Sequence, residues 1–309
     1  MLARLLALQV ALLPWSHAAA PAPLSGCPRF APGGVYNEPV TNAPVDPRSA
    51  QYVASMISAG NVKGFNAWTP ATLDVNVATD ATPLLSIYPK VRWHSFSTRV
   101  PWSPGFRIQP LGDAHAIVLQ KDTCHLYELY QASYSAGVLS AYSGADWDLA
   151  KPLTALPPGT SGSTASGLPL LAGAVTWGDI EAGVIDHALD WGAPAGSVAQ
   201  WSYVSPASDT DGIAYKGISL FRLPYGAHLR LKASFDIAGF PPQARIIAQA
   251  MKTYGVVLYD TGCCNAIPLV MPEAGKDPWD SADLAALNRL RISDFEVLRL
   301  PPIQRVPGH

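Results

Sequence analysis

Short apolar runs divide the middle of the chain into segments of strand length. Between residues 84 and 191, apolar or alternating runs are separated by proline and glycine, and the clearest lie at 91–96, 116–119, 126–130 and 185–189. Runs of this length between turn residues are typical of β-strands. The pattern predicts a series of antiparallel strands, interrupted by one loop over the Gly, Ser and Thr residues of 159–167.

The last third of the chain has a different pattern of apolar and polar residues. Apolar and polar residues alternate over 229–235, which predicts a half-buried strand. Pro241 and Pro242 then open a stretch, ended by Gly255, in which apolar residues recur at helical spacing. These residues are Ala244, Ile247, Ala248 and Met251. Because 256–259 is again apolar, we expect a strand, a helix and a strand, with a crossover long enough for parallel pairing.

Further helices are expected towards both ends of the chain. Asp46 and Pro47 precede an apolar stripe that Gly60 ends, and a second capped helix is predicted over 281–290, followed by a strand at 295–298. We therefore predict a mainly β fold with some α. It would have an antiparallel, β-sandwich-like or jelly-roll-like core, the strand–helix–strand unit and peripheral helices, all in one globular domain spanning 46–309.

The N-terminus has the pattern of a secretory signal peptide. A basic start, an apolar run ending at Trp15 and the small residues of Ser16-His17-Ala18 predict a signal peptide over 1–18, followed by an extended, Pro- and Gly-rich lead-in over 19–45. The apolar run is shorter than the about 20 residues of a membrane-spanning helix, and no later segment qualifies, so no transmembrane segment is predicted. These features indicate a secreted or periplasmic protein.

A lipid anchor is the alternative to free secretion. Residues 24–27, Leu-Ser-Gly-Cys, have the form of a lipobox, in which Cys27 would carry the lipid. Prolines separate this tetrapeptide from the apolar run, which favours the soluble secreted product.

Four cysteines form an even set suited to disulfides in an oxidising compartment. They are Cys27, Cys124, Cys263 and Cys264. Since a bridge between neighbours in the chain would be strained, the pairing expected is Cys124 with Cys263 or Cys264, and Cys27 with the remaining cysteine. No Cys/His spacing suggests zinc.

Composition excludes several classes of function. Only 14% of the 309 residues are charged, the formal net charge is −2, and no run of Lys and Arg occurs, so nucleic acid is not an expected partner. The chain contains no G-x-S-x-G elbow, Walker loop or G-x-G-x-x-G turn, which argues against common hydrolases, NTPases and dinucleotide enzymes.

The segment 112–149 holds the densest candidate chemistry. On a strand, Glu128 shares its face with Leu126 and Tyr130, and these large neighbours would raise the pKa of its carboxyl group. A protonated carboxylic acid beside an ionised carboxylate can hydrolyse glycosidic bonds, with Asp146 or Asp148 as the ionised partner if the chain folds back. The alternative is that Glu128 faces solvent on an edge strand or pairs with an arginine.

Two histidines are candidates for assisting roles. His115 follows Asp113 and could act as a base, whereas His187, between Ile185 and Leu189 on one strand face, reads more simply as a hydrogen-bonded interior residue. The HxH-then-Glu spacing of cupin metal sites is absent, so we predict neither a metal ion nor a cofactor.

Three further features of the sequence are candidates for catalysis or binding. Asp179 and Glu181 would share one face if extended, although a polar loop is the simpler interpretation. The sequence VVLYDTG at 256–262 resembles the aspartic protease motif, but no second DTG or DSG supplies the other aspartate, so a protease is rejected. Tryptophans, including Trp147 and Trp201, could stack on sugar rings, although most are expected in the core.

Several segments together resemble a family of uncharacterised secreted bacterial proteins. The matching segments, in chain order, are GDAHAIVLQKDTCHLYELY, SGADWDL, GLPLLAG, WGDIEAGVIDHAL, GAHLRLKASFDIAGFPPQARIIAQAMKTYGVVLYDTG and SDFEVL. The resemblance covers most of the chain after residue 18 and implies a secreted bacterial protein of one contiguous domain, with no assigned activity. The family's middle loop carries an aspartate that SGSTASGLP lacks here, which argues against chemistry in this loop.

The sequence thus favours a secreted protein that acts on polysaccharide. Glu128 would be the acid, Asp146 or Asp148 its partner, and His115 and His187 would assist. The alternative is a non-catalytic cell-envelope or carbohydrate-binding module, in which a groove would carry tryptophans without converging carboxylates.

Overall fold

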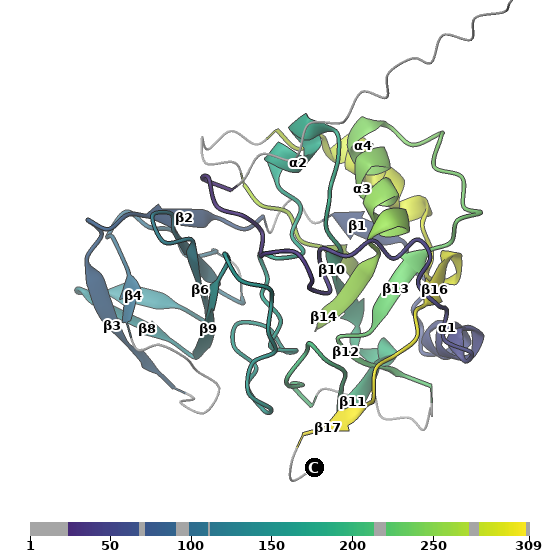
Figure 1. Ribbon diagram of the computed structural model, residues 1–309, viewed down its shortest axis with the longest axis horizontal. Helices are drawn as coiled ribbons and strands as arrows, with labels where there is room; N and C mark the ends of the chain where they lie inside the picture. Colours follow the sequence, from purple (N-terminus) through teal and green to yellow (C-terminus); the bar gives the residue numbers. More distant parts are fainter. Residues whose placement is uncertain are drawn as a thin grey trace, which may run out of the picture.

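Two lobes lie side by side in the molecule (Figure 1). The computed structural model describes residues 24–67, 72–90, 99–110, 112–212, 221–271 and 278–306. The expected signal peptide and the expected strand at 91–96 lie outside the described residues. A small lobe of strands, at the left of Figure 1, is built from residues 72–90, 99–110 and 112–148, and most of the other described residues form a larger lobe.

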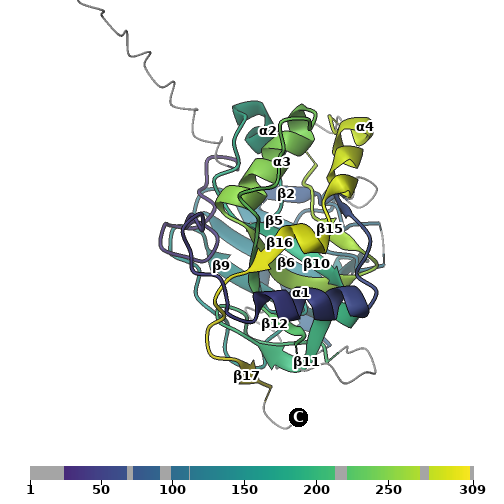
Figure 2. The same cartoon turned by 90° about the vertical axis from the view of Figure 1, so that its right-hand side faces the viewer.

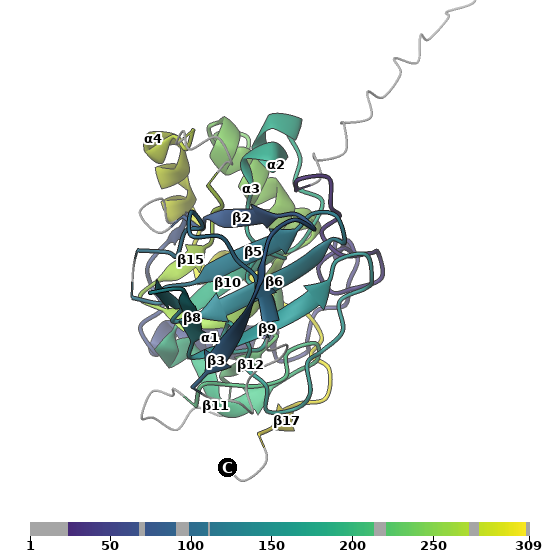
Figure 3. The ribbon, with the colours of Figure 1, turned by 90° about the vertical axis from the view of Figure 1, so that its left-hand side faces the viewer.

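Two four-stranded sheets make the small lobe, seen from its outer side in Figure 3. The inner sheet has the strand order β2 (Val75–Ala78), β5 (Ala116–Gln120), β6 (His125–Tyr130) and β9 (Ser143–Asp148). The outer sheet has the order β4 (Arg99–Pro101), β3 (Leu84–Pro89), β8 (Val138–Ala141) and β7 (Ser133–Ser135). The predicted strands at 116–119 and 126–130 are confirmed as β5 and β6.

The inner sheet of the small lobe is buried on both faces. Along β5, Ala116 and Val118 point into the core between the two sheets, whereas Ile117 and Leu119 belong to the core shared with the large lobe. Side chains on a strand alternate between faces, so a strand covered on both sides needs the continuous apolar run that β5 has. This sheet is therefore the wall by which the small lobe meets the large one.

The large lobe is centred on a mixed six-stranded sheet. Its order is β1 (Phe65–Ala67), β15 (Asn265–Ile267), β10 (Leu189–Pro194), β14 (Val256–Gly262), β13 (His228–Leu231) and β16 (Phe295–Val297). A smaller sheet at the bottom of Figure 1 has the order β12 (Leu223–Tyr225), β11 (Val198–Tyr203) and β17 (Gln304–Arg305). β10 and β14 run parallel at the centre of the large sheet.

Helices cover the large lobe, as Figure 2 shows. They are α1 (Ser49–Ser58), α2 (Trp177–Ala182), α3 (Pro242–Thr253) and α4 (Ser281–Leu284), which a 3₁₀ helix (Ala285–Arg289) continues. Further 3₁₀ turns occur at Ala195–Ser197 and Ile292–Asp294. The helices predicted after Pro47, after Pro241 and over 281–290 are confirmed. No helix within the described ranges combines the length and apolar character needed to cross a bilayer.

The predicted β-rich class, with a strand–helix–strand unit and peripheral helices, is confirmed, but the sheets are mixed rather than antiparallel. β2 pairs parallel with β5, β3 with β8, and β11 with β12. The parallel pairing expected across α3 is wrong, because β13 and β14 are antiparallel. The chain turns at 232–235, directly after β13, and β14 begins beside the C-terminal end of β13. The parallel partner of β14 is β10.

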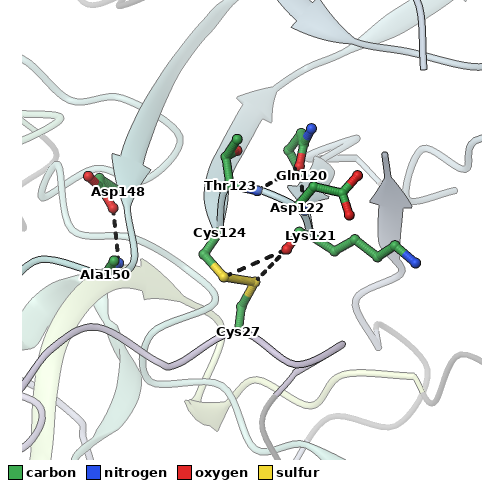
Figure 4. Close-up of a disulfide and its surroundings, with 8 residues drawn as sticks. All are labelled: Cys27, Gln120, Lys121, Asp122, Thr123, Cys124, Asp148 and Ala150. Carbon is green, nitrogen blue, oxygen red and sulfur yellow. Dashed lines mark hydrogen bonds between the residues drawn. A yellow bond between two sulfur atoms is a disulfide. The ribbon is translucent and has the colours of Figure 1, made fainter. Parts of the chain in front are cut away.

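The lead-in is fixed to both lobes. Cys27 is fully buried and bonded to Cys124 in the turn between β5 and β6, with both sulfurs close to the Lys121 carbonyl oxygen (Figure 4). Since the sulfur of Cys27 is bonded to Cys124, this residue has no free thiol for the lipid anchor considered in the sequence analysis. Arg29 pairs with Asp179 on helix α2 of the large lobe at 2.8 Å and donates to the carbonyl oxygens of Leu171 and Ala174.

The disulfide pairing expected from the sequence is wrong. Cys27 pairs with Cys124, and Cys263 pairs with its neighbour Cys264 in the turn between β14 and β15. The physical reason is the position of the lead-in, which runs beside the β5–β6 turn and brings the Cα atoms of Cys27 and Cys124 to 5.3 Å. A disulfide of this kind is typical of proteins in oxidising compartments outside the cytoplasm.

Candidate functional site

A cleft of about 600 Å³ lies where the two lobes meet. The small lobe contributes residues around β6 and β9, and the large lobe contributes the C-terminal end of β14, the start of β15 and residues 209–211. The third wall is the segment 159–174, here named the bridging loop, of which residues 161–165 face the cleft. In open sheets, ligand sites commonly lie beyond the carboxyl ends of parallel strands, and β10 and β14 end here.

Asp260, in the DTG sequence at the end of β14, lines the cleft and has a raised pKa. Its carboxylate accepts hydrogen bonds from the Ala165 amide at 3.1 Å and from the Thr261 amide at 2.6 Å. Burial outweighs these bonds and, with the charges of Asp211 and Asp113, raises the pKa of Asp260 to about 7. A carboxyl group that keeps its proton near neutral pH can serve as a general acid.

Asp211 is an exposed carboxylate held in place beside Asp260. One of its oxygens accepts the Tyr225 hydroxyl at 3.0 Å, and the other accepts the Thr261 hydroxyl at 3.4 Å. Burial, together with the negative charges of Asp260 and Asp211, raises the pKa of Tyr225, so this phenol stays protonated and donates. The two hydroxyls fix the orientation of the Asp211 carboxylate at the mouth of the cleft.

The small lobe adds Asp113 and His115 to the opposite wall. The Asp113 carboxylate is exposed, while the ring of His115 lies with Nδ1 at 3.1 Å from Gln109 Oε1 and Nε2 at 3.1 Å from the Ser163 carbonyl oxygen. Burial lowers the pKa of His115, although the Asp113 charge opposes it. Because the Ser163 carbonyl oxygen can only accept, Nε2 donates to it, and a neutral ring then accepts at Nδ1 when the Gln109 amide turns its NH₂ group towards that nitrogen. The predicted candidate His115 thus lines the cleft and supports the bridging loop.

Four aromatic side chains also line the cleft. Tyr130 and Tyr142 come from the small lobe, with their ring centroids 6.0 Å apart, and Trp201 and Tyr259 come from the large lobe. Trp201 has a positive φ of 55°, which is rare for a bulky residue, and a Cβ on Gly212 would collide with its ring. Aromatic faces of this kind commonly bind the apolar faces of sugar rings and other flat groups.

Glu128 lies beneath the bridging loop and does not line the cleft. Its side chain is 0% exposed, and its carboxylate accepts the amides of Leu170 and Leu171 at 2.8 Å each and the Ser163 hydroxyl at 2.6 Å. Burial raises the pKa of Glu128, with these bonds opposing it. Its burial excludes the exposed position of the sequence alternative, and none of the arginines in the described ranges pairs with it. The carboxylate instead anchors the loop that forms one cleft wall.

A second buried carboxylate fixes the far end of the bridging loop. Asp190 on β10 accepts the Tyr36 hydroxyl at 2.5 Å and the Gly173 amide at 3.2 Å. Burial raises the pKa of both Tyr36 and Asp190, so the phenol stays protonated and donates. With Glu128 on the small lobe and Asp260 and Asp190 on the large lobe, the bridging loop is tied to both lobes by carboxylates.

The structure separates Glu128 from the partners predicted for it. In the β6–β9 register, Glu128 lies opposite Ala145 and Tyr127 lies opposite Asp146, so Asp146 and Asp148 project from the sheet face opposite to Glu128. Asp146 binds the His125 ring at 2.5 Å, and Asp148 pairs with Lys151 at 2.8 Å. The predicted partnership of Glu128 with Asp146 or Asp148 is therefore wrong.

His187 is an interior residue outside the cleft. Its side chain is fully buried, with Nδ1 at 2.8 Å from the Ala188 carbonyl oxygen and Nε2 at 3.7 Å from Asp179, which also binds Arg29. The Arg29 and His187 charges, with hydrogen bonds, lower the pKa of Asp179 against the effect of its burial. Asp179 and Glu181 lie on helix α2 rather than in an extended loop, because Thr176 and Asp179 form a capping box.

The cleft residues that sequence reasoning missed carried weak signals. Asp260 belongs to the DTG motif, which in the sequence alone indicates only one half of an aspartic protease pair. Asp209 and Asp211 belong to the sequence SDTDG, a polar turn that resembles many others. Only the fold of the two lobes places them beside Asp113 and His115.

No cluster of three or more potential metal ligands occurs within the ranges that the structure describes. Comparisons with protein-family models, with curated proteins and with solved structures found no match.

Proposed function

We propose that the protein hydrolyses glycosidic bonds of a polysaccharide in the cleft between its lobes. The observation that carries the proposal is Asp260, a carboxyl group whose pKa of about 7 keeps it protonated near neutral pH, beside the hydrogen-bonded carboxylate of Asp211. Pairs of carboxyl groups in which only one keeps its proton are the usual catalytic groups of glycoside hydrolases.

In the proposed reaction, the two aspartates divide the work. Asp260 donates its proton to the bridging oxygen as the bond between that oxygen and the anomeric carbon breaks. A water molecule attacks the anomeric carbon, and the Asp211 carboxylate accepts the proton that this water loses. One water is consumed, and two shorter sugar chains leave the cleft. The aromatic rings of Trp201 and Tyr142 support the sugars on either side of the broken bond.

We propose an extracytoplasmic setting for this activity. The buried Cys27–Cys124 disulfide favours an oxidising compartment, and the N-terminal pattern favours export to the periplasm or the medium. A periplasmic protein would meet the cell wall, and a protein released to the medium would also meet polysaccharides of the surroundings.

The test is release of reducing ends from a panel of neutral, acidic and amino-sugar polysaccharides. At about pH 5–6, where Asp260 stays protonated, we expect the wild type to release reducing ends from at least one polymer. Asp260→Asn should lower the rate by about 10²–10⁴-fold, the usual contribution of a general acid. Asp148→Asn, at the surface of the small lobe, is the matched control and should keep the wild-type rate.

Two outcomes would contradict the proposal. One is a wild type that releases nothing from any polymer, and in that case retained glycan binding would favour the non-catalytic module. The other is an Asp260→Asn protein with wild-type activity.

A further inference from the structure

We infer that the disulfide between Cys263 and Cys264 is a site of reversible thiol–disulfide exchange, and that its reduction by a dithiol slows catalysis in the cleft. The effect on catalysis rests on the proposed function, whereas the exchange reaction does not. Cys263 lines the cleft, and the two cysteines are consecutive residues between the strands β14 and β15. The bridge therefore belongs to the wall of the cleft that carries Asp260.

The disulfides Cys27–Cys124 and Cys263–Cys264 differ in their access to solvent. Cys263 is exposed at the cleft, and its partner Cys264 is partly exposed. Cys124 is also partly exposed, but exchange there would have to release the fully buried Cys27 as a charged thiolate in an apolar interior. Exposed disulfides are the labile and regulatory ones. A dithiol should therefore reduce Cys263–Cys264 before it reduces Cys27–Cys124.

The bridged cysteines make the whole crossing between two strands that lie on either side of β10. β14 ends at Gly262 and β15 begins at Asn265, and β10 lies between these strands in the sheet. The far end of the crossing is fixed, because the fully buried Asn265 side chain is hydrogen-bonded to Asn61 and to the indole of Trp191. A bond between the only two residues of this crossing restricts the conformation of the whole turn.

The near end of the crossing positions the proposed catalytic groups. The Thr261 amide donates to Asp260 at 2.6 Å, and the Thr261 hydroxyl donates to Asp211 at 3.4 Å. Thr261 is separated from Cys263 by Gly262 alone. Once the bridge opens, the turn can adopt further conformations, so we expect the carboxyl groups of Asp260 and Asp211 to lose their fixed relative orientation.

The exchange consumes a dithiol and restores the thiols of both cysteines. One thiolate of the dithiol attacks Cys263 Sγ, the bond between the two cysteines breaks, and Cys264 leaves as a thiolate that takes up a proton. The second thiol of the reductant then attacks the mixed disulfide, releases Cys263 as a thiol and closes the reductant into a cyclic disulfide. Two electrons and two protons pass from the reductant to the protein. Exchange with an oxidised dithiol reverses the reaction.

Thiol mapping on the native full-length protein tests the exchange. The protein is treated with dithiothreitol, and the free thiols are alkylated and located by peptide mass spectrometry. We expect about two thiols per chain, at Cys263 and Cys264, before any appears at Cys27 or Cys124. Amide hydrogen exchange over 260–264 should become faster in the reduced protein, because the turn opens more often.

Hydrolysis rates test the effect on the cleft. On a polymer that the wild type hydrolyses, reduction should lower kcat about tenfold or more, because the catalytic groups lose their fixed positions. Reoxidation should restore the rate. Cys263→Ser/Cys264→Ser is the matched variant, since it keeps Cys27–Cys124. This variant should have the rate of the reduced wild type, and dithiothreitol should not change it.

The outcomes distinguish this inference from the proposed function. A wild type that hydrolyses no polymer overturns the glycosidase, while thiol mapping and hydrogen exchange still decide the inference. Four results would overturn the inference. They are a Cys263–Cys264 bridge that resists dithiothreitol in the folded protein, unchanged hydrogen exchange over 260–264 after reduction, hydrolysis that reduction does not slow, and an equal effect of dithiothreitol on the wild type and the double variant.

Discussion

The carboxylate of Asp260 receives two backbone hydrogen bonds at the edge of the cleft, whereas that of Glu128 receives three hydrogen bonds in the interior. Burial raises the pKa of both groups. The two carboxyl groups nevertheless differ in whether a ligand could reach them. Asp260 has the charges of Asp211 and Asp113 nearby and lines the cleft, while Glu128 is fully buried and hydrogen-bonded to the bridging loop. The same shift in pKa thus accompanies a candidate catalytic role in one residue and a structural role in the other.

The raised pKa of Asp260 predicts a pH-dependent stability. Between about pH 4 and about pH 7 the folded protein binds a proton that the unfolded chain has released, so the free energy of unfolding falls as the pH rises through this window. Asp260→Asn removes this dependence. From urea unfolding at both ends of the window, we expect the wild type to lose about 1–3 kcal/mol more than the variant, a figure reduced for partial exposure. Parallel pH curves for the two proteins would contradict the assigned pKa.

Replacement of Glu128 should lower the stability of the folded protein, and any loss of activity would follow from that. A glutamine at this position turns an NH₂ group towards one of three donors, leaving a buried donor without an acceptor. We expect Glu128→Gln to lower the free energy of unfolding by about 2–4 kcal/mol. Limited proteolysis should cut the bridging loop sooner. Asp148→Asn, which changes a partly exposed acid of the same lobe, is the control and should leave the unfolding midpoint in place.

An unchanged unfolding curve for Glu128→Gln, combined with loss of hydrolysis, would instead support the catalytic role that the sequence suggested for this residue.

At the scale of elements, the sequence predicts what depends on local periodicity. The helices α1 and α3 follow from their apolar stripes and the prolines before them, and the alternation along β6 correctly puts Leu126 and Glu128 on one face. Register is a different matter. A shift of one residue between β6 and β9 would bring Asp146 to the face of Glu128, but it would also move Ala145 and Trp147 off the core face, so the hydrophobic pattern of β9 favours the observed register. The partner proposed for Glu128 failed for this reason.

The two disulfides should contribute very differently to stability. Cys27–Cys124 links residues 97 positions apart, so in the chain-entropy account its removal in Cys27→Ser/Cys124→Ser should cost about 2–5 kcal/mol. Cys263–Cys264 links neighbours and restricts the unfolded chain very little, so Cys263→Ser/Cys264→Ser should change the free energy of unfolding by less than about 1 kcal/mol. Thermal unfolding of both double variants measures the difference. Equal losses would contradict the role given to the lead-in.

At the scale of the whole molecule, the cleft exists only because the two lobes meet. Asp113 and Asp260 are 147 positions apart in the chain and come from different lobes, so no local pattern could have joined them. The parallel pairings could not be predicted either, because parallel neighbours such as β2 and β5 are separated in the chain by other strands. The β-rich class and the helices could be predicted from the sequence, and the arrangement that forms the candidate site could not.

The role of Asp260 as general acid is tested most directly by varying the leaving group. The rates of wild type and Asp260→Asn are compared on the polysaccharide and on a dinitrophenyl glycoside of its sugar unit, whose leaving group departs without a proton. We predict that Asp260→Asn is slower by about 10²–10⁴-fold on the polysaccharide and by less than about tenfold on the dinitrophenyl glycoside. Equal losses on both substrates, or no loss on either, would contradict the assignment of Asp260 as the acid.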